Sequence, residues 1–245
     1  MLSGTAEVAE LAARACEMAS FDAKAVTLAG VQVLQAVFEM DWAARQAVLP
    51  PGLHPTNPPI VTFLAWQVPD SPWGSFTMAQ ARAGCRSGVR PRGFVAGAVN
   101  DNPAAAAALA GGWGLPGVAG QVRLQRWYDA VELEVVVGTA TALRLVASRP
   151  VPLRLGDVQY TVTTSLALTP RGLRLVQSEP EYAMDRVERV QPRLESFDPS
   201  AWGEPALAPT TPVAATVGTG AVTLPPLRYV SRPEVSAFEG TEPVR

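Results

Sequence analysis

Residues 130–148 read AVELEVVVGTATALRLVAS, and this stretch decides the fold class. Its two runs, 130–138 and 140–148, are rich in β-branched and apolar residues and lie between turn signals, as strands of a sheet do. The same pattern recurs along most of the chain, both before and after this stretch. Strands or short apolar runs are predicted over residues 26–40, 59–68, 74–81, 94–99, 122–127, 159–168, 172–178 and 227–230.

Helical patterns are fewer. Helices are predicted over residues 3–19, 41–48 and 102–110. Glu7 and Glu10 lie near the positive end of the first helix dipole, and Gly111 and Gly112 can stop the third helix. Residues 182–223 are interrupted by prolines and alanines and indicate a less regular stretch.

Because strands outnumber helices, the predicted fold class is β-rich (α+β). One domain is expected over residues 25–234, since the parts without strands are too short to fold alone. Residues 1–24 are expected to form an N-terminal helical appendage, and residues 235–245 a mobile tail.

Composition excludes several classes of function. Hydrophobic residues make up 48% of the chain and charged residues 17%, which is enough apolar surface for a large core. The net charge of -2 and the scattered arginines leave no basic stripe for nucleic acid or for an anionic membrane. No run of about 18 uncharged apolar residues occurs, so neither a membrane span nor a signal segment is expected.

The two cysteines, Cys16 and Cys85, are far apart and form no CxxC pair, so neither a disulfide framework nor a zinc site is expected. A soluble, cytoplasmic protein fits this pattern best. Sequence motifs for nucleotide, metal or serine-hydrolase chemistry do not occur, and we expect no cofactor and no metal. The glycine-rich stretch 111–117 follows a helix rather than a strand, which favours a loop over a phosphate site.

Four landmarks lie in order along the chain. They are Leu49-Pro50-Pro51-Gly52-Leu53 followed by Pro59-Ile60-Val61, then Pro69-Asp70-Ser71 with Gly74 and Phe76-Thr77, then Asn100-Asp101-Asn102-Pro103-Ala104, and then Gly112-Trp113-Gly114-Leu115-Pro116. In order and spacing these landmarks resemble those of the acetoacetate decarboxylase family. The fourth landmark resembles the family's Gly-[Tyr/Phe]-Pro segment, which leads to the active lysine. A looser likeness over 136–143 and 224–230 extends the resemblance to residues 25–234.

The resemblance implies a closed, antiparallel, cone-shaped β-barrel with an apolar central cavity, commonly assembled into homo-oligomers. In the family, the residue after the proline is a lysine that forms a Schiff base with a ketone, and a second lysine beside it lowers its pKa. In this chain those two positions hold Gly117 and Val118.

The other polar positions of the family are replaced as well. By resemblance, the two acidic positions fall at Leu64 and Met78, and the substrate-side arginine falls at about Val31. The resemblance therefore implies a cavity emptied of charge and a divergent member that lacks the Schiff-base lysine. Lys24 is the only lysine in the chain and is expected to be a solvated surface residue.

Strand alternation predicts which side chains face the cavity. Leu64 shares a face with Trp66, and Met78 shares a face with Phe76 and Gln80. With the loop residues, these positions describe a pocket for an apolar ligand, in which Gln80 is the candidate catalytic residue. The candidate substrate-binding residues are Val31, Leu64, Trp66, Phe76, Met78, Trp113, Gly117 and Val118. The alternative is that these side chains simply fill the barrel as core.

Two other candidate sites have simpler explanations. His54, the only histidine, lies in a proline-rich turn and is expected at the surface, where it cannot make a metal site alone. Glu132 and Glu134 share one face of their strand, which is more often a solvated face than a catalytic pair.

Three hypotheses for function remain open. The first is an enzyme of specialised metabolism, such as a cyclase, isomerase or dehydratase, that acts on an apolar, polyketide-type small molecule without a covalent lysine. The second is a noncatalytic protein that binds or carries a similar ligand. The third is a decarboxylase or aldolase that uses Lys24.

Overall fold

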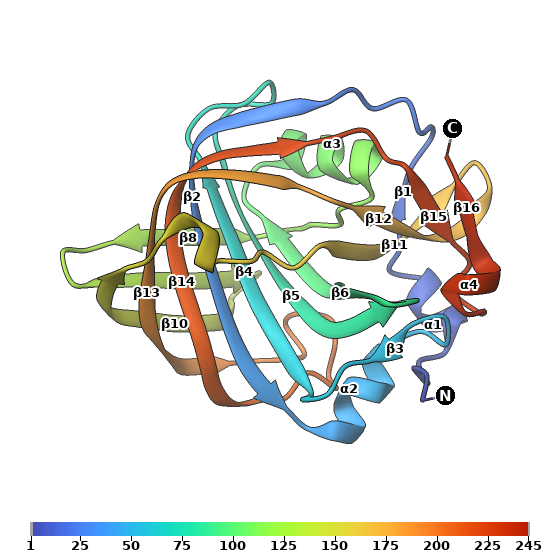
Figure 1. The fold of residues 1–245 in the computed structure, drawn as a ribbon, viewed down its shortest axis with the longest axis horizontal. Coiled ribbons are helices and arrows are strands. Elements are labelled where there is room, and N and C mark those ends of the chain that lie inside the picture. Colours follow the sequence, from blue (N-terminus) through green and yellow to red (C-terminus); the bar gives the residue numbers. More distant parts are fainter. Residues whose placement is uncertain (1, 245) are drawn as a thin grey trace.

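Long strands dominate the protein in the computed structural model, which describes residues 2–244 (Figure 1). The strands are β1 Cys16–Glu17, β2 Val26–Met40, β3 His54–Pro55, β4 Ile60–Val68, β5 Phe76–Ser87, β6 Arg90–Asn100, β7 Val118–Ala119, β8 Gln121–Arg126, β9 Ala130–Val137, β10 Ala140–Pro152, β11 Thr163–Thr169, β12 Gly172–Ser178, β13 Glu181–Phe197, β14 Pro209–Leu224, β15 Tyr229–Ser231 and β16 Thr241–Pro243. The helices are α1 Val8–Ala12, α2 Trp42–Val48, α3 Pro103–Trp113 and α4 Ala237–Gly240, with one 3-10 turn, η1 Leu155–Asp157.

All sixteen strands belong to one sheet. Its hydrogen-bonded order is β16-β15-β12-β11-β6-β5-β4-β2-β14-β13-β10-β9-β8, with β1, β3 and β7 attached to β11, β5 and β6. The path ends at β8 and β16 without returning on itself, so the closed barrel expected from the resemblance is not confirmed. Most pairs are antiparallel, but β11 pairs with β6 in parallel, as do β1 with β11 and β7 with β6.

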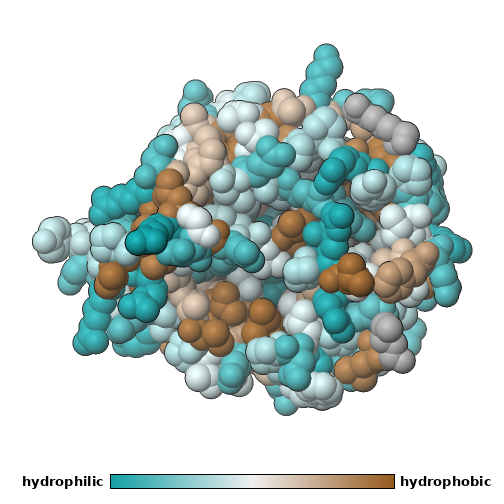
Figure 2. All heavy atoms as spheres, viewed as in Figure 1, coloured by the Kyte–Doolittle hydropathy of each residue, from teal (hydrophilic) through white to brown (hydrophobic). Residues whose placement is uncertain are grey.

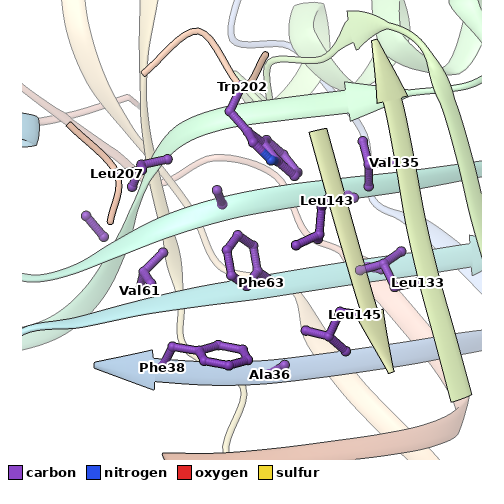
Figure 3. Packing of buried hydrophobic residues seen from close by; sticks show 14 of the residues in the cluster. Ala36, Phe38, Val61, Phe63, Leu133, Val135, Leu143, Leu145, Trp202 and Leu207 are labelled. Carbon is purple, nitrogen blue, oxygen red and sulfur yellow. The ribbon is translucent and has the colours of Figure 1, made fainter. Parts of the chain in front are cut away.

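The sheet buries both faces of its central strands. On β2 and β4, alternate side chains enter two separate hydrophobic clusters, as the two-residue period of a strand requires. One cluster joins β2, β4 and β5 to β8, β9 and β10 (Figure 3). In it Phe63 packs between Phe38 and Trp202, with ring centroids 5.8 Å and 6.1 Å away.

The second cluster lies on the opposite face of β2, β4 and β5. It packs these strands against α3, β12 and β15, and contains Leu64, Trp66 and Trp113. Strands 60–68 and 76–87 are buried at nearly every position rather than at every second one, as expected for strands covered on both faces.

Helix α2 confirms the prediction for residues 41–48. Asp41 is its N-cap, and the Asp41 carboxylate accepts a hydrogen bond of 2.9 Å from the Ala44 amide.

The predicted helix over 3–19 is wrong, because only α1 is helical there. Cys16 and Glu17 instead form β1, and the Met18 amide donates to the Leu168 carbonyl at 2.8 Å. Gly4 packs against the backbone of Leu49, where an added Cβ would lie 2.0 Å from the carbonyl oxygen. Pairing with the domain thus overrides local helix propensity, and the expected appendage is joined to the sheet.

Three further expectations need correction. The predicted helix end at Gly111 and Gly112 is too early, because α3 continues to Trp113 and is capped by Gly114 at φ 64°. The stretch 182–223 is not irregular but forms the two long strands β13 and β14. Residues 235–245, expected as a mobile tail, contain α4 and β16, which pairs with β15.

No helix within residues 2–244 is long and apolar enough to cross a membrane. On the face shown in Figure 2, hydrophobic side chains lie in separate patches between hydrophilic ones.

Candidate functional site

Four of the expected cavity residues form one block on β4 and β5. The strands are in register so that Leu64 lies opposite Gln80 and Trp66 opposite Met78. All four side chains point to the second cluster, and none is more than 3% exposed. The structure therefore brings these four side chains together, as strand alternation predicts. We call Leu64, Trp66, Met78 and Gln80 the wall.

The remaining members of the expected set divide into two groups. Val31, Phe76 and Trp113 belong to the same cluster as the wall. The Trp113 indole donates a hydrogen bond of 2.8 Å to the Pro225 carbonyl, which ties the end of α3 to the segment after β14. Six of the eight candidate substrate-binding residues therefore lie in this cluster, and Gly117 and Val118 do not.

Gly117 and Val118 lie elsewhere. Both line a separate pocket of about 340 Å³ together with Trp202, and Val118 is 56% exposed. A Cβ at Gly117 would lie 3.3 Å from the Asn100 Cβ, so the glycine permits close packing there. The expectation that these two residues line the same pocket as Leu64 and Trp66 is not met, because the chain after α3 turns to the other face of the sheet.

Arg82 is a residue of the wall that the sequence analysis missed. It follows Gln80 by two positions on β5, lies opposite Thr62 and is 1% exposed. The expectation of a cavity emptied of charge is therefore wrong. Gly93 of the neighbouring strand makes room for it, since a Cβ there would lie 3.1 Å from the Arg82 Cδ.

Hydrogen bonds fix the orientation of Arg82 and Gln80. The Arg82 Nε donates to the Gln80 Oε1 at 2.7 Å, and Arg82 Nη1 donates to the Thr161 carbonyl at 3.1 Å. Because arginine has no acceptor, the amide oxygen of Gln80 must face it, and the Gln80 Nε2 points away as a donor. Among the described residues, neither Gln80 Nε2 nor Arg82 Nη2 has a hydrogen-bond partner.

Two tyrosines complete the polar part of the site. Tyr160 and Tyr182 stack with ring centroids 4.1 Å apart, and Tyr182 meets Trp66 edge to face at 6.1 Å. The Tyr182 hydroxyl lies beside the Arg82 guanidinium and the Trp66 indole but makes no well-formed hydrogen bond with a described residue. Burial raises the pKa of Tyr182 to about 12, against the opposing effect of Arg82, so this hydroxyl keeps its proton at neutral pH.

Burial also shifts the pKa values of Arg82 and Tyr160. It lowers the pKa of Arg82, an effect that the nearby Tyr182 opposes. It raises the pKa of Tyr160 well above the ordinary tyrosine value. Both tyrosines are thus neutral hydrogen-bond donors, while the guanidinium, which starts from a very high pKa, stays charged.

Open space adjoins the tyrosines. Tyr160, Thr161 and Tyr182 line a pocket of about 580 Å³. Arg90 and Arg92 line both this pocket and an adjoining groove of about 800 Å³. Within the groove, Arg92 pairs with Glu179 at 2.8 Å. Leu64, Trp66 and Gln80 line neither the pocket nor the groove, so side chains fill the space in front of the wall. This agrees with the alternative that these residues are core.

The other candidates have simple positions. Lys24 is exposed, as expected for a solvated lysine. His54 is only 5% exposed, so its expected surface position is wrong. The N-terminal segment covers it, with Nδ1 3.1 Å from the Leu2 carbonyl oxygen. Glu132 and Glu134 occupy the partly exposed positions of β9, away from its buried side chains.

Cys16 and Cys85 are both free thiols. Between Leu2 and Val244, no three histidine, cysteine, aspartate or glutamate side chains lie together as ligands of a metal ion. The polar groups available in the site are therefore an amide, a guanidinium, an indole and two hydroxyls.

Comparison with known proteins identifies the family. The family model described as "Acetoacetate decarboxylase (ADC)" matches residues 16–233. The acetoacetate decarboxylase of Legionella pneumophila subsp. pneumophila str. Philadelphia 1 has a similar structure, with a TM-score of 0.74 and 19% identity over 84% of this chain and 86% of that chain. No curated protein matches the sequence.

Two structural relatives have other descriptions. The enduracididine biosynthesis enzyme MppR, in complex with the condensation product of pyruvate and imidazole 4-carboxaldehyde, has a TM-score of 0.67 and 18% identity over 85% of this chain and 90% of that chain. An acetoacetate decarboxylase-like enzyme from Sphingomonas wittichii RW1 has a TM-score of 0.63 and 18% identity over 84% and 92%. At these identities the likeness concerns the fold.

Proposed function

Since the chain belongs to the acetoacetate decarboxylase family, we propose that it is a small-molecule enzyme of that fold which works without a Schiff base. The observation that carries this proposal is the wall of β4 and β5. It holds Leu64 and Met78 at the two positions where the resemblance places acidic residues, and Gly117, outside the wall, stands at the position of the family's active lysine. The only lysine, Lys24, is exposed and lies before the first long strand.

The chemistry that such a wall supports is polarisation of a carbonyl. Gln80 Nε2 is a donor whose direction is set by the bond between Gln80 Oε1 and Arg82. A donor held in place inside a dry site stabilises developing negative charge on a substrate oxygen without reorganisation. The apolar surroundings would hold a substrate in a reactive conformer. Cyclisation, isomerisation and dehydration of a polyketide-type substrate are reactions of this kind.

The description of MppR as a biosynthetic enzyme supports a place in specialised metabolism, because it shows that this fold also occurs outside acetoacetate decarboxylation. We further propose that the protein acts in the cytoplasm as a homo-oligomer. The two free thiols and the oligomers common in the family favour this assignment.

A noncatalytic carrier is the second candidate. The chemistry of Gln80, Tyr160 and Tyr182 favours it, because these neutral groups can hydrogen-bond a ligand but supply no nucleophile or general base at neutral pH. A carrier would bind one ligand per chain and release it unchanged.

Two experiments test the proposal. Borohydride treatment in the presence of a ketone should leave no adduct on the protein by mass spectrometry, and an adduct on Lys24 would overturn the mechanism without a Schiff base. Incubation with a panel of apolar ketones and polyketide-type thioesters should show more than one turnover per chain. Strict one-to-one binding with no conversion would instead support the carrier.

The role of Gln80 has its own test. Gln80→Leu should lower kcat by about a hundredfold, the usual effect of removing one donor to a developing oxyanion, while substrate affinity changes little. Gln67→Leu, on the same strand pair but the opposite face, is the matched control and should leave kcat unchanged. Equal losses of kcat and affinity in Gln80→Leu would refute the polarising role.

A further inference from the structure

Two arginines of β6 lie close together at an open surface. Arg90 and Arg92 are two positions apart, so their side chains leave the same face of the strand from Cα atoms about 7 Å apart. Arg92 is 4% exposed, whereas Arg90 is exposed and forms no ion pair with a described residue. Burial lowers the pKa of Arg92, Glu179 opposes this effect and the charge of Arg90 adds to it, so the two guanidinium groups lie near enough to repel each other.

Both arginines lie where several open spaces meet. They line the groove of about 800 Å³ and the adjoining pocket of about 580 Å³. They also line a smaller pocket of about 250 Å³, together with Tyr229. Volumes of about 300–1,000 Å³ are typical of sites for small molecules, so the groove and the larger pocket can each hold part of a ligand.

The groove has more positive than negative side chains. Its charged residues are Arg90, Arg92 and Arg228 against Glu179 and Glu181, which leaves one positive charge on a chain whose net charge is -2. The Glu179 carboxylate is shared, because it accepts from Arg92 at 2.8 Å and also pairs with Arg228. The buried Nε of Arg92 has no hydrogen-bond partner within the described chain. The carboxylates of the groove therefore leave Arg90 and part of Arg92 to an anion from outside.

The rest of the groove is neutral and holds Arg92 in place. The Oε1 of Gln177 accepts from Arg92 Nη2 at 3.2 Å, so the guanidinium is oriented before a ligand arrives. Residues 225–227, with the sequence Pro-Pro-Leu, form an apolar part of the lining. The surface thus suits a molecule with one anionic group and a neutral body.

We propose that this groove binds the phosphate group of an organic phosphate, whose neutral body lies in the pocket of Tyr160 and Tyr182. A phosphate monoester carries a charge of about −1.5 to −2 at pH 7 and three acceptor oxygens, so two neighbouring guanidinium groups can bind it together. A planar carboxylate is instead fully engaged by one bidentate arginine. The inference rests on the proposed function and deepens it, because it makes the substrate a conjugate, such as an acyl thioester, whose arm ends in a phosphate.

The pocket leads from the two arginines towards the wall. Tyr182 lines the pocket and meets Trp66 of the wall edge to face, with ring centroids 6.1 Å apart. A body that fills the pocket therefore brings its far end to within one ring of the wall. Because Arg90 is exposed, it also adds positive potential where an anion enters.

Matched probes with and without the phosphate test the charge requirement. Phosphopantetheine and pantetheine have the same body and differ by one phosphate group, and inorganic phosphate is the charged group alone. By isothermal titration at low salt, the wild-type chain should bind phosphopantetheine at least tenfold more tightly than either of the other two, and the affinity should fall as salt is added. Equal affinity for phosphopantetheine and pantetheine, or no binding of any probe, would overturn phosphate recognition. Equal affinity for phosphopantetheine and inorganic phosphate would overturn the placement of the body in the pocket.

Variants assign the effect to the groove. Arg90→Gln should lose at least tenfold in affinity for phosphopantetheine and none for pantetheine, and it should fold normally because Arg90 is exposed. Arg123→Gln is the matched control, since Arg123 is an exposed arginine of β8 that also forms no ion pair with a described residue. Glu181→Gln should bind phosphopantetheine severalfold more tightly, because it removes a negative charge from the groove. Unchanged affinity in Arg90→Gln, or an equal loss in Arg123→Gln, would refute the site.

The two proposals fail separately, because the titration needs no turnover. Loss of the phosphate preference would overturn this site and leave the reaction without a Schiff base standing. An adduct on Lys24 would overturn that reaction and leave the phosphate site standing.

Discussion

Gly114 should be the least replaceable of the turn glycines, and the structure sets the size of the effect. In Gly114→Ala two costs add. The residue has φ 64°, and a side chain in this left-handed region costs about 1–2 kcal/mol. Its new Cβ would also lie 2.9 Å from the Val176 Cβ and 3.1 Å from the Met18 sulfur, and overpacking of this kind costs about 1–3 kcal/mol. We expect a loss of about 2–5 kcal/mol in unfolding free energy.

Gly138 provides a matched control. It has φ 60° in the turn between β9 and β10, and a Cβ there would meet nothing within 4 Å. Gly138→Ala should therefore show the backbone cost alone, about 1–2 kcal/mol. The difference between the two variants isolates the contact between the end of α3 and β12.

Urea unfolding followed by tryptophan fluorescence measures both losses. The comparison is valid if the dependence on urea concentration has the same slope in all three proteins. Equal losses in Gly114→Ala and Gly138→Ala would show that the end of α3 does not pack on β12 as closely as described, and would refute the reasoning.

Two other predictions concern the core and the thiols. Phe63→Ala should cost about 3–5 kcal/mol in the same urea assay, because Phe63 is 1% exposed and packs on several aromatic rings; a loss below about 1 kcal/mol would contradict this packing. Burial raises the pKa of Cys16 to about 11 and that of Cys85 to about 12, so the folded chain keeps these protons where the unfolded chain releases them. Their stabilising contribution is complete below the unfolded thiol pKa of about 8.5 and is lost as pH rises toward the folded values. Unfolding free energy should thus fall between about pH 8 and pH 10, and fall less steeply in the double variant Cys16→Ala/Cys85→Ala, whereas equal slopes would refute the assignment.

The strands with an apolar or alternating pattern could be predicted from the sequence. Residues 26–40 are an example, since β2 begins and ends at the predicted residues. Strands β13 and β14 could not, because their prolines argue against a strand. In the structure Pro209 and Pro212 lie at shifts in the register between β14 and β2, where a missing amide hydrogen costs least. Such irregularities depend on the partner strand and leave no local signal.

The site could be predicted in part. Leu64, Trp66, Met78 and Gln80 share a face because the pairing of β4 with β5 keeps a regular two-residue period. The same period continues to Arg82, which could have been found by extending the predicted strand beyond Ala81. An arginine is expected at the surface, however, and only the tertiary structure shows it enclosed. The path of the chain after Trp113, which takes Gly117 and Val118 away from this wall, carries no signal in the sequence.

The pairing of β2 with β14 has a consequence for how the molecule forms. Strand β2 lies early in the chain and pairs with β14, which lies near the C-terminus. Their ladder extends from Val26 opposite Leu224 to Met40 opposite Pro209. Contacts between such distant segments form slowly, because the intervening chain must be ordered first. During synthesis, the backbone amides and carbonyls along that edge of β2 stay unpaired until the ribosome has released β14. The nascent chain is therefore most prone to associate with other chains in that interval, and a chaperone would have its largest effect then.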